Sequence, residues 1–280
     1  MTVPIALRMT SGLPGGRLVA ALGVGLLLLS VTTYAFAWSP AWVSASSAPI
    51  PEWDYQGEHG PPDWDALDPA YSACGRGKQQ SPIDLRAIVS SAEGRLHFSY
   101  RSSPLSLAND GRVIRGDDLA GSHLFVDGGR YELIEYQFHT PSEHSIDGRR
   151  ADMELQLLHR DAHGRHIIVA VFLQAGRRPN SILRRIAERL PPPGEVYYGG
   201  QIGINPLFLL PAERDFYAYP GSLTVPPCTE GVEWLVLRTP VEVDAAWVRR
   251  FRQAMGSNAR PLQQRNGRPI VYHSARSARP

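Results

Sequence analysis

The chain has 280 residues, of which 43% are hydrophobic and 20% are charged, a balance that is ordinary for a globular protein and does not favour a disordered one. The 29 basic residues include Arg8 and Arg17, the only charged residues before Glu52, so 27 basic and 27 acidic side chains remain after them. Because the charges of this main part are balanced, the composition gives no electrostatic case for nucleic acid as a partner.

The N-terminus has the pattern of an export signal. Residues 18–38 carry no charged side chain, follow two arginines and contain the small-x-small pattern Ala35-Phe36-Ala37. We therefore expect residues 1–37 to be a cleaved signal peptide and the protein to be periplasmic or extracellular. The alternative is an uncleaved membrane anchor formed by residues 18–38, because an apolar run of about 20 residues can span a bilayer.

The composition changes again after this segment. Residues 38–51 are rich in Ser, Ala and Pro and show no hydrophobic period, which is typical of a flexible linker. No internal repeat follows, so we predict a single domain at residues 52–273 and a frayed tail at residues 274–280.

Cys74 and Cys228 are the two cysteines of the chain. In an exported protein an even pair of cysteines predicts one disulfide. The alternative is two separate buried thiols.

The middle of the chain is dominated by short segments rich in β-branched, aromatic and aliphatic residues, which predict strands. They are separated by turn sequences such as Asp147-Gly148, which favour antiparallel hairpins. The strands are expected at Ser122 to Val126, Tyr131 to His139, Asp152 to Arg160 and His166 to Gln174.

Two helices are also predicted. The first spans Ser181 to Leu190, with apolar residues at helical spacing and Pro191 as a stop, and the second spans Asp244 to Met255, with Asp244 as its N-cap. The predicted fold class is therefore mainly β with minor helices.

Strand geometry predicts which polar side chains share a face. Successive side chains alternate, so Gln137 and His139 point the same way, as do Glu154 and Gln156. If these two strands are neighbours, Gln137, His139 and Gln156 converge on one point, whereas His159 has the opposite parity and points away.

Five ordered motifs carry a family resemblance that covers almost the whole predicted domain. They are YQGEHGP at residues 55–61, QQSPIDL at 79–85, TPSEH at 140–144, YPGSLTVPPCTE at 219–230 and NARPLQ at 258–263. Together they resemble the α-carbonic anhydrases. The resemblance implies a large twisted, mostly antiparallel central sheet, a disulfide between Cys74 and Cys228, zinc as the cofactor, and CO2 and bicarbonate as substrate and product.

The resemblance fails at the metal ligands. In such enzymes three histidines hold Zn²⁺, and the zinc binds a water whose pKa falls to about 7. Here glutamine stands at two of the three ligand positions, Gln137 and Gln156, and only His139 is retained. Because an amide oxygen is a hard, neutral donor more typical of Ca²⁺ sites, we expect zinc to be absent or weakly bound.

The residues around the metal position are mixed in kind. Thr224 and Glu143 match the pair that orients a zinc-bound hydroxide, and Glu154 matches a carboxylate that supports a ligand histidine. Arg112 stands where the family has a proton-shuttling histidine, and a guanidinium does not titrate near neutral pH. In the substrate region that the resemblance implies, Val225 stands in place of a threonine. Leu223 and Leu158 are the other residues expected there.

Three hypotheses follow. The first is an exported protein that has lost CO2 hydration, as in the carbonic anhydrase-related proteins, and binds an unidentified ligand or protein. The second is an active or weakly active carbonic anhydrase with an atypical metal site. The third is a binding module held at the membrane by an uncleaved N-terminus.

Overall fold

The computed structural model describes residues 52–86 and 90–274 of the protein. The predicted signal or anchor, the predicted linker and the tail from residue 275 lie outside the described residues. Within the described ranges, no helix is both long enough and apolar enough to cross a membrane.

Strands make up most of the described chain. They are β1 (Asp84–Leu85), β2 (Ser90–Glu93), β3 (His97–Ser99), β4 (Ser103–Asn109), β5 (Ile114–Asp117), β6 (His123–Val126), β7 (Gly129–His139), β8 (Ser145–Ile146), β9 (Met153–Arg160), β10 (His166–Gly176), β11 (Val196–Ile204), β12 (Phe216–Ser222), β13 (Glu230–Asp244) and β14 (Val271–Ser274). The helices are α1 (Trp64–Leu67), α2 (Ala73–Arg76), α3 (Ser181–Ala187) and α4 (Ala245–Met255), with 3-10 turns at Gly57–His59, Pro69–Tyr71 and Pro206–Leu209. The predicted fold class, mainly β with minor helices, is confirmed.

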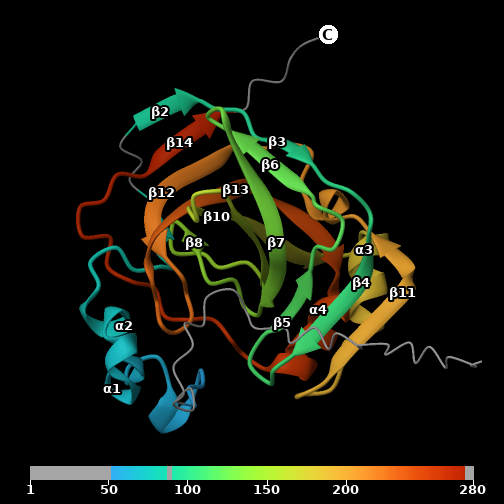
Figure 1. Ribbon diagram of the computed structural model, residues 1–280, viewed down its shortest axis with the longest axis horizontal. Helices are drawn as coiled ribbons and strands as arrows, with labels where there is room; N and C mark the ends of the chain where they lie inside the picture. The colour runs from blue at the N-terminus through green and yellow to red at the C-terminus, as the bar shows by residue number, and fades with distance from the viewer. Residues whose placement is uncertain (1–51, 87–89, 275–280) are drawn as a thin grey trace, which may run out of the picture. The chain divides into compact units, whose positions relative to one another are not determined.

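Twelve of these strands form one large twisted sheet (Figure 1). The strand order is β11-β4-β5-β7-β9-β10-β13-β12-β14-β2, while β6 pairs with both β3 and β7. Most neighbours are antiparallel, but β10 pairs with β13 and β14 pairs with β2 in parallel. The expected mostly antiparallel sheet is therefore confirmed, with two parallel pairings that connect segments far apart in the sequence.

The predicted elements agree closely with the structure. The four expected strands correspond to β6, β7, β9 and β10, and Asp244 caps α4 by accepting a hydrogen bond from the backbone N–H of Ala246 at 2.8 Å. Helix α3, however, ends at Ala187 rather than at Leu190. Leu190 precedes a proline and therefore avoids helical dihedral angles, which shortens the helix.

The two faces of the sheet are covered differently. One face packs with α3 and α4 in the larger hydrophobic core, which contains Phe138, Leu155 and Leu157. The other face carries a second apolar cluster, which includes Leu158, Ile168 and Phe172. Because side chains alternate along a strand, Gln156 lies on the same face as Leu158, opposite the helices.

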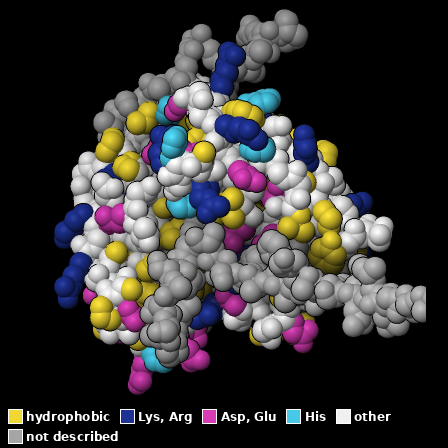
Figure 2. Space-filling model, viewed as in Figure 1, with side chains coloured by type: hydrophobic (Ala, Val, Ile, Leu, Met, Phe, Trp, Pro, Cys, Tyr) yellow, Lys and Arg dark blue, Asp and Glu magenta, His cyan; other side chains and the backbone are white. Residues whose placement is uncertain are grey.

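The surface shows no broad patch of one charge on the face seen in Figure 2, where basic and acidic side chains are interspersed. This distribution agrees with the balanced composition of the chain after residue 51.

Cys74 and Cys228 form the predicted disulfide, with their Cα atoms 5.1 Å apart. The bridge joins α2 to the loop before β13, and it lies in a small apolar cluster with Trp64 and Tyr71. The buried side chain of Arg260 binds the same region, because its Nη2 donates to the Cys74 carbonyl at 2.8 Å.

Removing this bridge is expected to lower the free energy of unfolding strongly. The two cysteines are 154 residues apart in sequence, and closing so long a loop contributes about 5 kcal/mol in the chain-entropy model. Denaturant unfolding of a Cys74→Ala/Cys228→Ala variant should show a loss of this order. A reductant should destabilise the unaltered protein and leave the variant unchanged; equal sensitivity of the two proteins would contradict the prediction.

Candidate functional site

The register of β7 and β9 brings the predicted site residues together. Gln137 lies directly opposite Gln156, and His139 lies directly opposite Glu154. The predicted adjacency of the two strands is therefore correct. His139 and Gln156 are fully buried, whereas Gln137 is half-buried.

The side-chain amide of Gln156 lies between two buried carboxylates. Its Nε2 donates to Oε2 of Glu143 at 2.8 Å and to Oε1 of Glu154 at 2.9 Å. Because ionised carboxylates only accept hydrogen bonds, the amide nitrogen must face them. Its oxygen then accepts from Nε2 of Gln137 at 3.0 Å, which orients the second amide as well.

His139 has one satisfied ring nitrogen and one unsatisfied one. Nδ1 lies 2.8 Å from the carbonyl oxygen of Asn258 and therefore carries the proton that it donates. Nε2 has no hydrogen-bond partner among the described residues and lies 3.7 Å from Oε2 of Glu143. An unsatisfied buried nitrogen costs free energy. Of the three predicted ligand positions, residues 137, 139 and 156, the one at His139 thus has a buried nitrogen that is open to a ligand.

Glu143 makes different contacts from those that the resemblance implies. Its Oε1 accepts from the backbone N–H of Arg260 at 2.9 Å, and its Oε2 accepts from Gln156. Oγ1 of Thr224 is buried and has no hydrogen-bond partner within the described ranges. In this arrangement the hydroxyl-to-carboxylate hydrogen bond between Thr224 and Glu143 is not formed.

Glu154 belongs to a second buried network. Its two oxygens accept from Nδ1 of His144 at 2.9 Å and from the His144 backbone N–H at 2.8 Å. Nε2 of His144 then lies 2.6 Å from the hydroxyl of Tyr219. Burial opposes ionisation, but the charge and hydrogen bonds of His144, with the bond from Gln156, hold the pKa of Glu154 below its ordinary value.

These contacts decide how well the residues fit a zinc ion. Zinc in a catalytic site is held by three protein ligands, which are His nitrogen, Cys sulfur or Asp/Glu oxygen atoms with free lone pairs. Among the three positions only Nε2 of His139 is such a donor, because Gln137 and Gln156 carry amides, whose nitrogens donate hydrogen bonds and offer no free lone pair. Within the described ranges no group of three or more His, Cys, Asp or Glu is placed to hold a metal. The donor set does not fit zinc.

The remaining predicted residues lie around this centre. Nη1 of Arg112 donates to the carbonyl of Trp53 at 2.9 Å, and its guanidinium lies 4.5 Å from the centre of the Trp53 ring. Leu158 is buried in the apolar cluster on the site face, and Leu223 packs against that cluster. Val225 is half-buried, and its carbonyl accepts from the Cys228 backbone at 2.8 Å.

His159 points away from the site, as its parity predicts. Its Nε2 lies 2.6 Å from the hydroxyl of Tyr100, on the face that carries the larger core. Burial lowers the pKa of His159 to about 3, which keeps the imidazole neutral in the folded protein.

Sequence reasoning missed a group of charged residues beside Gln137. Arg115 on β5 lies opposite Gln137, and Asp117 lies opposite Glu135. Burial raises the pKa of Glu135 to about 7, with Arg115 opposing the shift and Asp117 adding to it. Glu135 shares the parity of Gln137 and His139 and could have been found from it, whereas Arg115 and Asp117 required knowledge of the β5–β7 pairing.

Comparison with known proteins agrees with the fold. Residues 59–276 match the family model described as eukaryotic-type carbonic anhydrase. A carbonic anhydrase of Nostoc sp. is 36% identical over 252 residues, which cover 88% of this chain and 95% of that protein.

Two solved structures are also similar. The α-carbonic anhydrase of Thermovibrio ammonificans, in complex with the inhibitor sulfanilamide, has a TM-score of 0.76 and 36% identity over 80% of this chain and 100% of its own. A dioscorin in complex with ascorbate has a TM-score of 0.74 and 31% identity over 81% of this chain and 100% of its own. Together these matches show that the chain belongs to the α-carbonic anhydrase family.

Replacing the bridging amide should destabilise the fold more than replacing its partner. Gln156→Leu leaves Oε2 of Glu143 without its donor and removes one of the two bonds to Oε1 of Glu154, and it should cost about 2–4 kcal/mol because unsatisfied charged groups are the expensive case. Gln137→Leu removes one bond at a half-buried position and should cost about 1 kcal/mol. Denaturant unfolding at pH 7 measures both, and equal costs would contradict the assigned network.

The lowered pKa of His159 predicts that the folded protein loses stability in acid. Its pKa is about 3 when folded and about 6.5 when unfolded, so the unfolded state binds the extra proton as the pH falls below 6.5. Between pH 7 and 4.5 this should cost about 2–3 kcal/mol. A Tyr100→Phe/His159→Leu variant, which removes both partners of the hydrogen bond, should lose less over the same range; an identical pH dependence would refute the assignment.

Proposed function

We propose that this protein is an exported member of the α-carbonic anhydrase family that does not hydrate CO2 and instead acts by binding. The observation that carries the proposal is the Gln156 amide, which uses its nitrogen on Glu143 and Glu154 and its oxygen on Gln137. A metal at this position would have to displace three hydrogen bonds that the chain makes with itself.

The charges at the site support the proposal. Glu154 is compensated by His144, and Glu143 interacts with Arg260. Burial lowers the pKa of Arg260 to about 10, with Glu143 opposing the shift, so this guanidinium stays charged at neutral pH. Both carboxylates thus interact with side chains of the chain itself.

Proton transfer gives a second line of support. Arg112 stands at the position of the family's shuttling histidine, and its guanidinium is bound to the carbonyl and stacked on the ring of Trp53. A group that does not titrate near neutral pH cannot relay protons. A restored metal site would therefore still lack the usual shuttle.

Export rests on the composition of residues 1–37 and on the disulfide, because such bonds persist mainly in oxidising compartments. A periplasmic or extracellular location follows if the segment is cleaved, and a membrane-tethered binding module follows if residues 18–38 are retained. N-terminal sequencing of the exported protein separates the two.

The specific alternative is a weakly active carbonate dehydratase with an atypical metal. The observation that favours it is the unpartnered Nε2 of His139, buried 3.7 Å from Glu143 Oε2. These two atoms are the groups that could hold a cation, together with an amide oxygen freed by rotation of Gln137 or Gln156. A chelator should then lower both the activity and the melting temperature.

Elemental analysis of purified protein, followed by stopped-flow CO2 hydration, tests the proposal. We expect zinc far below one equivalent and no turnover above background. The Gln137→His/Gln156→His variant supplies three imidazoles and should bind zinc near one equivalent, with hydration still limited by proton transfer.

A matched control is Gln201→His/Gln264→His, which adds two histidines at exposed positions away from the site. It should bind no more zinc than the unaltered protein. Stoichiometric zinc together with turnover in the unaltered protein would overturn the proposal and support the alternative.

A further inference from the structure

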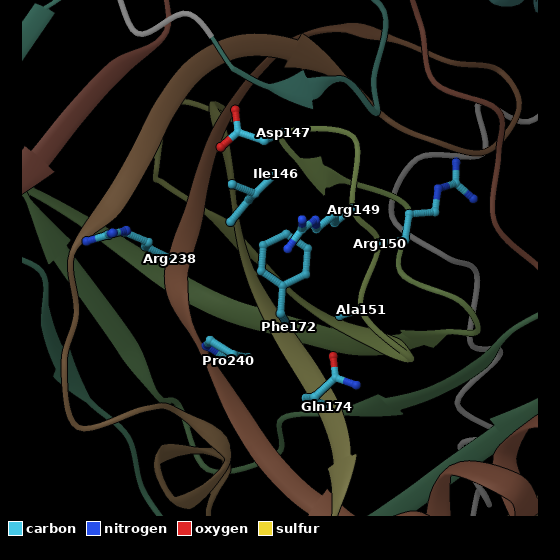
Figure 3. A pocket seen from close by; sticks show the side chains of 9 residues that line it. All are labelled: Ile146, Asp147, Arg149, Arg150, Ala151, Phe172, Gln174, Arg238 and Pro240. Atoms are coloured by element: carbon cyan, nitrogen blue, oxygen red, sulfur yellow. The ribbon is translucent and has the colours of Figure 1, made fainter.

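A pocket of about 540 Å³ lies on the site face of the sheet, apart from the metal position (Figure 3). Its lining includes apolar groups from three parts of the chain, namely Ile146, Phe172 and Pro240. Pockets of a few hundred Å³ with an apolar lining and a few polar groups are typical small-molecule sites.

The charged groups of this pocket are mostly basic. Arg149, Arg150 and Arg238 line it together with one acidic residue, Asp147. Figure 3 shows the Arg149 guanidinium in front of the Phe172 ring in this view, with the Arg150 and Arg238 guanidinium groups to either side. The combination of an apolar lining and excess positive charge selects for an anion that carries an apolar body.

The three arginines differ in how far they are engaged. Arg238 interacts with the Tyr272 hydroxyl and lies near Asp215, and Arg150 donates through Nη2 to the carbonyl of Arg260 at 3.2 Å. The Arg149 side chain is exposed and makes no hydrogen bond or ion pair with the described residues. Arg149 is therefore the guanidinium most available to a ligand.

The pocket is connected to the former metal site. Phe172 on β10 lies directly opposite Glu154 on β9, so the two side chains share the site face of the sheet. Arg150 binds the carbonyl of Arg260, and the backbone N–H of Arg260 donates to Glu143. The pocket and the former metal site are thus adjacent, but different side chains line them.

From these contacts we propose a second binding site in this pocket, for a small organic carboxylate with an aromatic or branched aliphatic body. The carboxylate pairs with Arg149, supported by Arg150, and the apolar body packs on Phe172 and its neighbours. This site is independent of any metal and of CO2 hydration.

Calorimetric titration of the full exported protein with benzoate tests the site, with neutral benzamide as a ligand of the same shape. Benzoate should bind about fivefold more tightly than benzamide, which is the effect of one partly exposed charge pair. Its affinity should fall on raising the salt concentration, because exposed charges are screened. Arg149→Gln should weaken benzoate binding about fivefold and leave benzamide unchanged.

Arg249→Gln, which alters an exposed arginine on α4, is the matched control and should bind benzoate as the unaltered protein does. Because the lost contacts are at the surface, all variants should keep the same melting temperature without ligand. Equal affinity for benzoate and benzamide, or an unchanged benzoate affinity in Arg149→Gln, would overturn the assignment.

Discussion

The amide of Gln156, which donates to Glu143 and Glu154 through one nitrogen, is the interaction on which the site depends. Two buried carboxylates need donors, and an amide nitrogen carries two hydrogens on a single atom. A neutral imidazole carries a hydrogen on only one of its two nitrogens and cannot serve both carboxylates from one atom. A histidine at residue 156 would present a free nitrogen lone pair to a metal. The amide of Gln156 instead donates its hydrogens to the carboxylate oxygens of Glu143 and Glu154.

Retention of Glu143 and Glu154 has a structural explanation that does not require catalysis. Glu143 accepts from the Arg260 backbone, and Glu154 accepts twice from His144, which in turn contacts Tyr219. Replacing either carboxylate would leave buried donors without partners, at a cost of about 1–3 kcal/mol each. The fold can thus keep these residues whether or not a metal binds, and their presence favours neither function over the other.

Much of the site could be predicted from the sequence, because strand alternation is local. Strand alternation placed Gln137, His139 and Gln156 together and directed His159 to the other face, and the structure agrees on each point. The hydrogen bonds could not be predicted, since Glu143 reaches Gln156 from a loop. Arg115 beside Gln137 and the pocket around Phe172 depend on the pairing of β5 with β7 and on the fold of distant loops, which no local pattern specifies.

A site that holds no metal, as proposed above, also changes where an anion would bind. A zinc ion concentrates positive charge at the centre of such a site, where an anion can reach it. Here the guanidinium of Arg260 near the centre is buried and donates to the oxygens of Gln80, Ser81 and Cys74. The accessible positive charge lies instead on Arg149 and Arg150, at the neighbouring pocket on the same face. Because exposed charge can pair directly with a ligand, the proposed anion site lies at these arginines and not at the metal position.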